Sequence, residues 1–172
     1  MRDALEQLVC NWDGKTTSTL KTAYERFHHH PDFVDHLINL SADRSCDRGA
    51  TWLLKHAFSN GEPKLSGERS ARHLAALAHL SHWETRLHLL QYLDHLTIPG
   101  EAERLLHGFI LETLEAENRF LRAWGYYALA LHAERFPAHQ NEALNRLNEA
   151  MTRETAGSVK VRIRKALERI NP

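Results

Sequence analysis

The sequence predicts an all-α protein whose helices recur in pairs. Only 8 Gly and 5 Pro occur among 172 residues, and most of them fall between segments in which apolar residues recur every three or four positions. That spacing gives a helix one apolar face, whereas the strict alternation of a half-buried strand is almost absent. Helical segments also recur at an interval of roughly 36 residues, which suits a stacked two-helix unit.

The expected helices follow one another with short connections. In the first part of the chain they cover residues 3–12, 18–29, 31–40, 44–58, 68–80 and 82–96. Four more contain the periodic segments 102–113, 120–131, 143–151 and 159–170. The longest expected loop is the Gly- and Pro-containing stretch 59–67.

Helix boundaries carry their own signals. Ser81 and Glu84 fit a capping box, in which the two side chains satisfy free backbone N–H groups at a helix start. Trp83 and Leu87 follow at helical spacing, so we expect both on the buried face of that helix. The later helices are separated by turn-forming residues at Ile98-Pro99-Gly100, Pro137 and Gly157-Ser158.

Four of the helices align on one template of apolar or small positions. The second template position holds Thr51, Arg86, Arg122 and Lys160, which stand 35, 36 and 38 residues apart. The remaining positions hold Ala50, Leu54, Ala57 and Phe58; Thr85, Leu89, Tyr92 and Leu93; Leu121, Gly125, Ala128 and Leu129; and Val159, Ile163, Ala166 and Leu167. Such a period predicts helix pairs that bury a continuous core by stacking on their neighbours.

This template resembles the second helix of HEAT repeats. The strings that carry the resemblance are Leu121-Arg122-x-x-Gly125-x-x-Ala128-Leu129 and Val159-Lys160-x-x-Ile163-x-x-Ala166-Leu167. The resemblance covers roughly residues 31–170 and implies a right-handed α-solenoid of about four to five stacked antiparallel helix pairs. We expect a single domain over 1–172, with 1–30 as an amino-terminal cap and 31–171 as repeats.

In HEAT repeats the template Arg often pairs with an acid of a neighbouring repeat. Acids that precede the second helices of this chain are Asp43, Glu117 and Glu154. The resemblance therefore implies that some of the template cations serve as salt bridges between repeats.

The resemblance also implies a concave binding face built from the second helices, with Tyr126 exposed on the same side as Arg122. The residues that we expect to bind a partner there are Arg48, Lys55, Arg86, Arg122, Tyr126, Lys160 and Arg164. Clustered guanidinium groups hold carboxylates or phosphates bidentately, so the expected partner is an acidic protein or peptide.

The expected function is a non-catalytic scaffold that recognises this protein or peptide partner. No nucleophile elbow, phosphate-binding loop or dinucleotide fingerprint occurs, so the sequence indicates no catalytic residue and no cofactor. The alternative is a DNA-binding repair protein that resembles the HEAT-like alkylation-repair glycosylases. Lys plus Arg and Asp plus Glu both number 22, and this zero net charge disfavours nucleic acid as the partner.

The predictions about metal binding and cellular location depend on a few residues. The His-rich segment 28–36 contains metal-binding residue types, but adjacent His residues on a helix point apart, so we expect no metal. Cys10 and Cys46 lack metal-ligand spacing and are expected to be free thiols, which fits the cytoplasm. No apolar run approaches the roughly 18 residues of a membrane span, so no membrane partner is expected.

Overall fold

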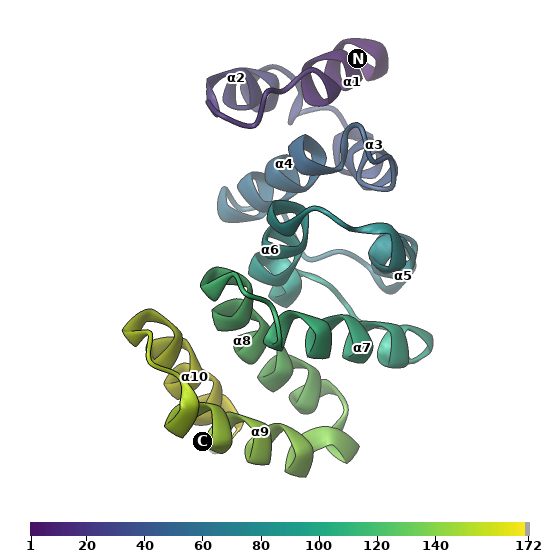
Figure 1. Ribbon diagram of the computed structural model, residues 1–172. Helices are drawn as coiled ribbons and strands as arrows, with labels where there is room; N and C mark the ends of the chain where they lie inside the picture. Colours follow the sequence, from purple (N-terminus) through teal and green to yellow (C-terminus); the bar gives the residue numbers. More distant parts are fainter. Residues whose placement is uncertain (171–172) are drawn as a thin grey trace. The chain divides into compact units, whose positions relative to one another are not determined.

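A computed structural model describes residues 1–170, and every named element in that range is helical (Figure 1). The α-helices are α1 (Arg2–Cys10), α2 (Ser18–Phe27), α3 (Phe33–Leu40), α4 (Asp47–Ser59), α5 (Gly67–Leu74), α6 (Trp83–Tyr92), α7 (Glu103–Leu114), α8 (Arg119–Arg135), α9 (Gln140–Arg153) and α10 (Gly157–Ile170). Four 3₁₀ segments accompany them: η1 (Ala75–His79), η2 (Leu93–His95), η3 (Gly100–Ala102) and η4 (Pro137–His139). The all-α prediction is confirmed.

Each α-helix overlaps a segment in which the sequence predicts one. The predicted helices 68–80 and 82–96 are shorter, because each continues as a 3₁₀ segment. The start of α6 also differs: His82, not Ser81, is the N-cap, and its Nδ1 accepts a hydrogen bond from the Glu84 backbone N–H at 3.2 Å. The expected burial of Trp83 is wrong, since this side chain is 42% exposed and α6 packs against α4 through the Thr85 and Leu89 face.

The chain forms two compact units, Met1–Pro99 and Gly100–Pro172. In the first unit, α1, α3 and α5 lie on one side, and α2, α4 and α6 lie on the other (Figure 1). α4 is central to this unit because it contacts α1, α2, α3 and α6. The single domain over 1–172 and the cap role of residues 1–30 stay predictions.

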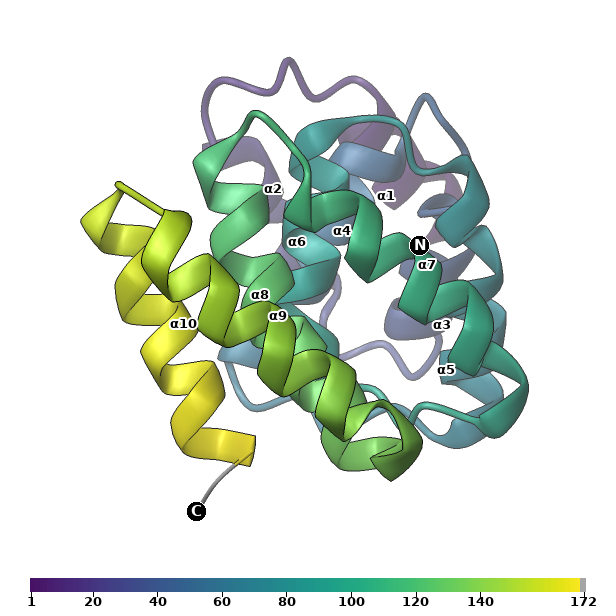
Figure 2. The same cartoon turned by 60° about the horizontal axis from the view of Figure 1, so that its bottom comes forward.

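The second unit is organised around α8. This helix packs against α7, α9 and α10, and α9 also packs against α10 (Figure 2). α8 starts at Asn118, whose side chain accepts hydrogen bonds from the backbone N–H groups of Phe120 and Leu121. It ends before Pro137, which cannot continue the hydrogen-bond ladder of a helix.

The aligned template positions form the interior face of α4, α6, α8 and α10. All of the apolar and small template residues in these helices are buried except Leu167, which is partly buried. The second template position is also buried at Thr51, but it is partly exposed at Arg86, Arg122 and Lys160. The periodicity in the sequence thus identified the inward face of each of these helices correctly.

A disulfide joins α1 to the start of α4, between Cys10 and Cys46. The two segments meet closely, because a Cβ placed on Gly49 would lie 2.7 Å from the backbone oxygen of Val9. The expectation of free thiols is therefore wrong: the two cysteines are 36 residues apart, and no local pattern reveals that the fold brings them together. The cytoplasmic location loses this support and stays a prediction.

None of the helices within residues 1–170 has both the length and the apolar character needed to cross a bilayer.

Gly125 lies where α7 and α8 approach each other closely. Gly125→Ala should lower the free energy of unfolding by about 1–3 kcal/mol, because overpacking forces neighbouring groups to move. The added Cβ would lie 2.4 Å from Thr113 Oγ1 and 3.0 Å from Leu114 Cδ2, and Thr113 is held by its 2.7 Å hydrogen bond to the Ile110 oxygen. Urea unfolding measures the change.

Gly108→Ala on α7 is the matched control for this substitution. A Cβ at Gly108 meets no atom within 4 Å, so the variant should be more stable by about 0.5–1 kcal/mol through helix propensity alone. Equal stabilities for the two alanine variants would contradict the close α7–α8 contact.

The disulfide should stabilise the folded protein by closing a loop in the unfolded chain. The double variant Cys10→Ala/Cys46→Ala should lose about 3–4 kcal/mol of unfolding free energy, the value expected from chain entropy for a separation of 36 residues. Reductant should lower the Tm of the wild type and leave that of the double variant unchanged. A wild-type Tm that is insensitive to complete reduction would contradict this role.

Candidate functional site

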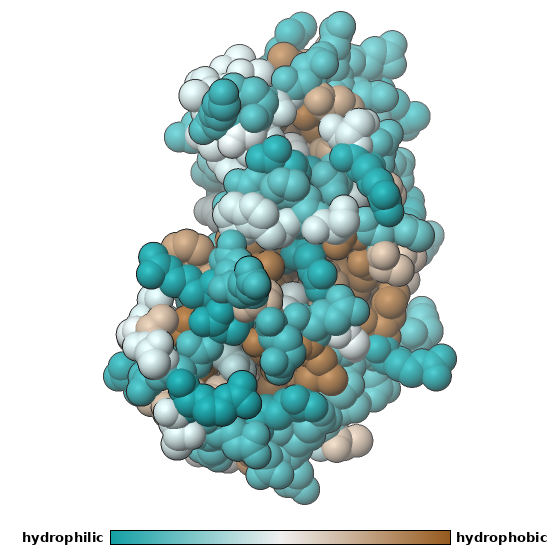
Figure 3. Space-filling model, viewed as in Figure 1, coloured by the Kyte–Doolittle hydropathy of each residue, from teal (hydrophilic) through white to brown (hydrophobic). Residues whose placement is uncertain are grey.

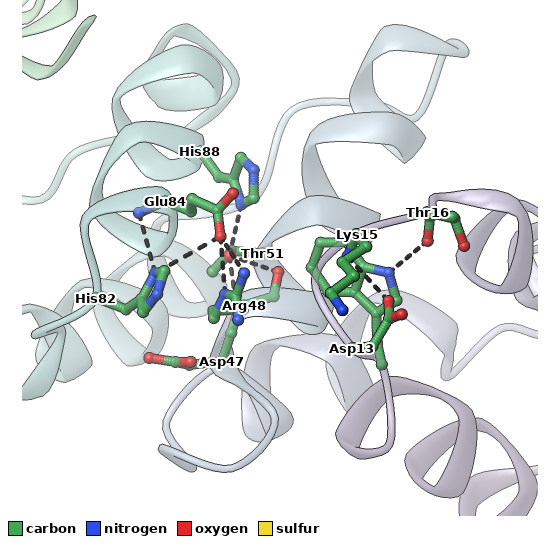
Figure 4. A network of polar contacts seen from close by, with 10 residues as sticks. Asp13, Lys15, Thr16, Asp47, Arg48, Thr51, His82, Glu84 and His88 are labelled. Atoms are coloured by element: carbon green, nitrogen blue, oxygen red, sulfur yellow. Dashed lines mark hydrogen bonds and ion pairs between the residues drawn. The ribbon is translucent and has the colours of Figure 1, made fainter. Parts of the chain in front are cut away.

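Arg48, the first of the predicted binding residues, joins α4 to α6. Its Nε donates to Glu84 Oε2 at 2.8 Å, and its Nη2 donates to the same oxygen. Figure 4 shows the two side chains pointing toward each other, with Thr51 and His88 alongside. The guanidinium also lies over the Trp12 ring, 5.5 Å from its centroid. Arg48 thus has a structural role in holding two neighbouring helices together.

Two buried histidines provide further links inside the first unit. His88 Nδ1 lies 3.1 Å from Thr51 Oγ1, between α6 and α4 (Figure 4). His73 is bonded at both ring nitrogens, to Tyr92 Oη at 2.7 Å and to Ser41 Oγ at 3.0 Å. Burial lowers the pKa of His73 to about 4 and that of His88 to about 3, so both rings are neutral at pH 7.

The other two predicted cations of the first unit are partly buried. Lys55 Nζ lies 5.9 Å from the Trp52 ring centroid, and burial lowers the pKa of this amine. Arg86 also interacts within the chain. Partner binding by Lys55 and Arg86 stays a prediction.

In the second unit, Arg122 of α8 forms an ion pair with Glu154. Its Nε lies 2.6 Å from Glu154 Oε1, and its Nη1 donates to the backbone oxygens of Ala116 and Glu117, each at 2.9 Å. Glu154 is one of the three acids that the HEAT resemblance suggested for such a pair. Arg122 therefore ties the start of α8 to the segment just before α10.

Tyr126 does not have the exposed position that the sequence suggested. Only 5% of this residue is accessible, and it lines a small cavity together with Leu114 of α7 and Ala150 of α9. Burial raises the pKa of its phenol. The structure does bring Tyr126 and Arg122 together, in the wall of a cleft of about 400 Å³.

Lys160 and Arg164 lie on α10, which carries the most concentrated positive charge of the second unit. Lys160, Arg164 and the neighbouring Lys165 form no ion pair among residues 1–170. Arg162 differs, since its guanidinium is stacked on Trp124 of α8, 3.7 Å from the ring centroid. Of the seven residues predicted to bind a partner, Lys160 and Arg164 thus carry a positive charge that no acid among residues 1–170 neutralises.

A cluster of histidines and glutamates in the second unit escaped the sequence analysis. α7 contributes Glu103 and His107, α8 contributes His132, η4 contributes His139 and α9 contributes Glu142. The ring centroids of His107 and His139 are 4.3 Å apart, and those of His132 and His139 are 4.8 Å apart. Burial lowers the pKa of His107 and brings that of His132 to about 4.

One local signal for this cluster was present in the sequence. His139 and Glu142 stand three positions apart at a predicted helix start, which places both on the same side of that turn. His107 lies 32 residues upstream, so its proximity depends on how α7 packs in the unit.

The chain is an all-helical protein, and the comparisons with known proteins add no family to that description. No protein-family model, no curated protein and no solved structure matches it. The resemblance to HEAT repeats stays a prediction that rests on the template residues.

The buried histidines should make the protein sensitive to mild acid. Their folded pKa values of about 4, 3 and 4 at His73, His88 and His132 lie below the ordinary 6.5, so the unfolded chain binds more protons below pH 6.5. The free energy of unfolding should therefore fall between pH 7 and pH 5, by about 2 kcal/mol for each ring. Chemical denaturation at the two pH values measures this loss.

His88→Gln tests the contribution of one ring. This variant should show a smaller stability difference between pH 7 and pH 5 than the wild type, by about 2 kcal/mol. His79→Gln is the control, because His79 is exposed and its ring is solvated in both states. An unchanged pH dependence in His88→Gln would contradict the assignment of a depressed pKa to His88.

Proposed function

We propose that this protein is a non-catalytic binding scaffold that captures an acidic protein or peptide segment along α10. The observation that carries the proposal is the charge of this helix: it holds five cations (Lys160, Arg162, Arg164, Lys165 and Arg169) and one acid (Glu168). The whole chain has zero formal net charge, so the net charge of +4 on α10 is offset by −4 on the rest of the chain, and positive charge is concentrated on this helix. Such a patch steers an anionic partner toward one place.

Two of the α10 cations lie on the side of the helix that faces away from the interior, whereas Arg162 stacks on Trp124 and Arg169 pairs with Glu134 of α8. Val159, Ile163 and Ala166 are buried, which leaves Arg164 and Lys165 exposed on the opposite side. Val161 is 46% exposed beside them, and it is one of four large apolar side chains exposed within residues 1–170. The face of the molecule in Figure 3 is mostly hydrophilic with small apolar patches. A segment that combines carboxylates with an apolar side chain would fit this surface.

The proposal includes a HEAT-like architecture: a right-handed α-solenoid of about four to five antiparallel helix pairs. Two observations support it. The aligned template residues face inward in α4, α6, α8 and α10, and Arg122 pairs with Glu154 in the manner that the resemblance implies. A solenoid provides an extended binding surface without a catalytic centre.

Substitutions on α10 test the proposal. The double variant Arg164→Glu/Lys165→Glu should weaken binding of a fluorescent peptide rich in Glu and Leu by about tenfold or more. Both substitutions replace a cation that attracts the peptide's carboxylates by an anion that repels them. Fluorescence anisotropy measures the Kd. The control Arg44→Glu/Arg104→Glu makes the same change in net charge at exposed positions elsewhere, and it should leave the Kd close to that of the wild type.

A parallel titration with labelled duplex DNA at two salt concentrations tests the DNA-repair alternative. Phosphate binding would give an affinity that falls steeply with salt. Strong, salt-sensitive DNA binding that is lost in Arg164→Glu/Lys165→Glu would favour a nucleic-acid partner for α10. Equal peptide binding by the α10 variant and its control would remove α10 as the binding surface.

A further inference from the structure

Three potential metal ligands converge in the second unit. One ligand atom from each of His107, His139 and Glu142 lies within 4.8 Å of the other two. We propose that these three side chains bind a divalent transition-metal ion, with Zn²⁺ as the ion that fits them best. Such a metal site is separate from the cationic face of α10 and does not depend on it.

The two distances from the imidazole nitrogens to the carboxylate oxygen match those of a tetrahedral site. His107 Nε2 lies 3.3 Å from Glu142 Oε2, and His139 Nδ1 lies 3.6 Å from the same oxygen. Nitrogen and oxygen ligands that are each about 2.0–2.1 Å from a tetrahedral zinc ion lie roughly 3.4 Å from one another. His107 Nε2 is buried and has no hydrogen-bond partner among residues 1–170, although it faces the carboxylate. A shared cation would explain this arrangement.

Two neighbouring side chains hold the ligands in the required orientation. His139 Nε2 lies 2.8 Å from Glu103 Oε1, which leaves Nδ1 directed toward Glu142. Histidines that bind metals commonly donate their second ring nitrogen to a carboxylate in this way. Arg146 Nε donates to Glu142 Oε1 at 2.9 Å and leaves Oε2 for the ion.

His132 closes one side of the site. This residue is 0% exposed, and its ring is stacked on His107 with centroids 5.0 Å apart. Its Nδ1 is buried without a hydrogen-bond partner among the described residues. The wall that His132 forms limits the access of water, which strengthens electrostatic attraction between the carboxylate and a cation.

The ligand types select the class of metal. Two imidazoles and one carboxylate are a ligand set typical of zinc sites that keep a fourth position for water or another ligand. Calcium and magnesium prefer oxygen ligands throughout, so neither fits a site with two ring nitrogens.

The experiment uses the full-length protein without a histidine tag, stripped of metal with a chelator. Zn²⁺ is titrated in competition with a chromogenic zinc indicator, and the Tm is measured with and without Zn²⁺. The segment 28–30 holds three histidines, two of them exposed, that could bind zinc weakly, so the variant His28→Gln/His29→Gln/His30→Gln provides the matched control. It removes three histidines and leaves the proposed ligands intact.

We expect one zinc ion per chain and a higher Tm with zinc, both in the wild type and in the 28–30 control. Glu103→Gln should weaken zinc affinity by about 10–100-fold, the usual effect of losing a carboxylate that orients a ligand. His107→Gln and Glu142→Gln should weaken it further. Glu142→Gln keeps an oxygen for Arg146, so its metal-free Tm should stay near that of the wild type, which separates ligand loss from misfolding.

Either of two results would overturn the proposal. One is a zinc affinity in Glu142→Gln and His107→Gln that equals that of the wild type. The other is loss of stoichiometric zinc binding in the 28–30 control, which would place the ion at the amino-terminal histidines.

Discussion

The fold depends on one constraint: α4, α6, α8 and α10 each turn the same stripe of apolar and small template positions toward the interior. Packing at native density leaves little room along that stripe, so small residues set how closely the helices approach. At Gly125 the hydroxyl of Thr113 occupies the space that a Cβ would need. Because the stripe of α10 takes up Val159, Ile163 and Ala166, Arg164 and Lys165 are left on the outer side of this helix.

Polar side chains inside the two units supplement this apolar packing with directional contacts. His73 links Ser41 to Tyr92, His88 links to Thr51, and Arg122 pairs with Glu154. A buried polar group costs free energy unless it is hydrogen-bonded. A shift of one helix along its neighbour that separated these partners would therefore destabilise the fold. These polar contacts fix how each helix is aligned along its neighbour more specifically than apolar packing alone would.

Helices and their inward faces could be predicted because both follow from local periodicity. The template placed Leu89 and Tyr92 inside correctly, whereas the burial of Trp83 was wrong because it relied on apolar spacing without the repeat. Most contacts between distant residues gave no such signal, and the pairing of Arg122 with Glu154 was suggested only by the HEAT resemblance. The disulfide, the burial of Tyr126 and the assembly of the histidine cluster all depend on how separate helices pack.

Of the predicted binding residues, those on the template position itself were the hardest to assign from sequence. Arg122 and Lys160 occupy equivalent positions, yet one is ion-paired and the other has no acidic partner in the described chain. The difference arises because Glu154 lies just before α10 and within reach of α8, a relation that charge type alone does not reveal.

The disulfide also changes the topology of the amino-terminal part of the chain. Residues 10–46 form a covalent ring that contains α2, α3 and the connection between α1 and α2. Lys15, Thr16 and Thr17 lie in this connection, outside any helix. A peptide bond cut there would open the ring without releasing a fragment, since Cys10 and Cys46 would still hold the two pieces together.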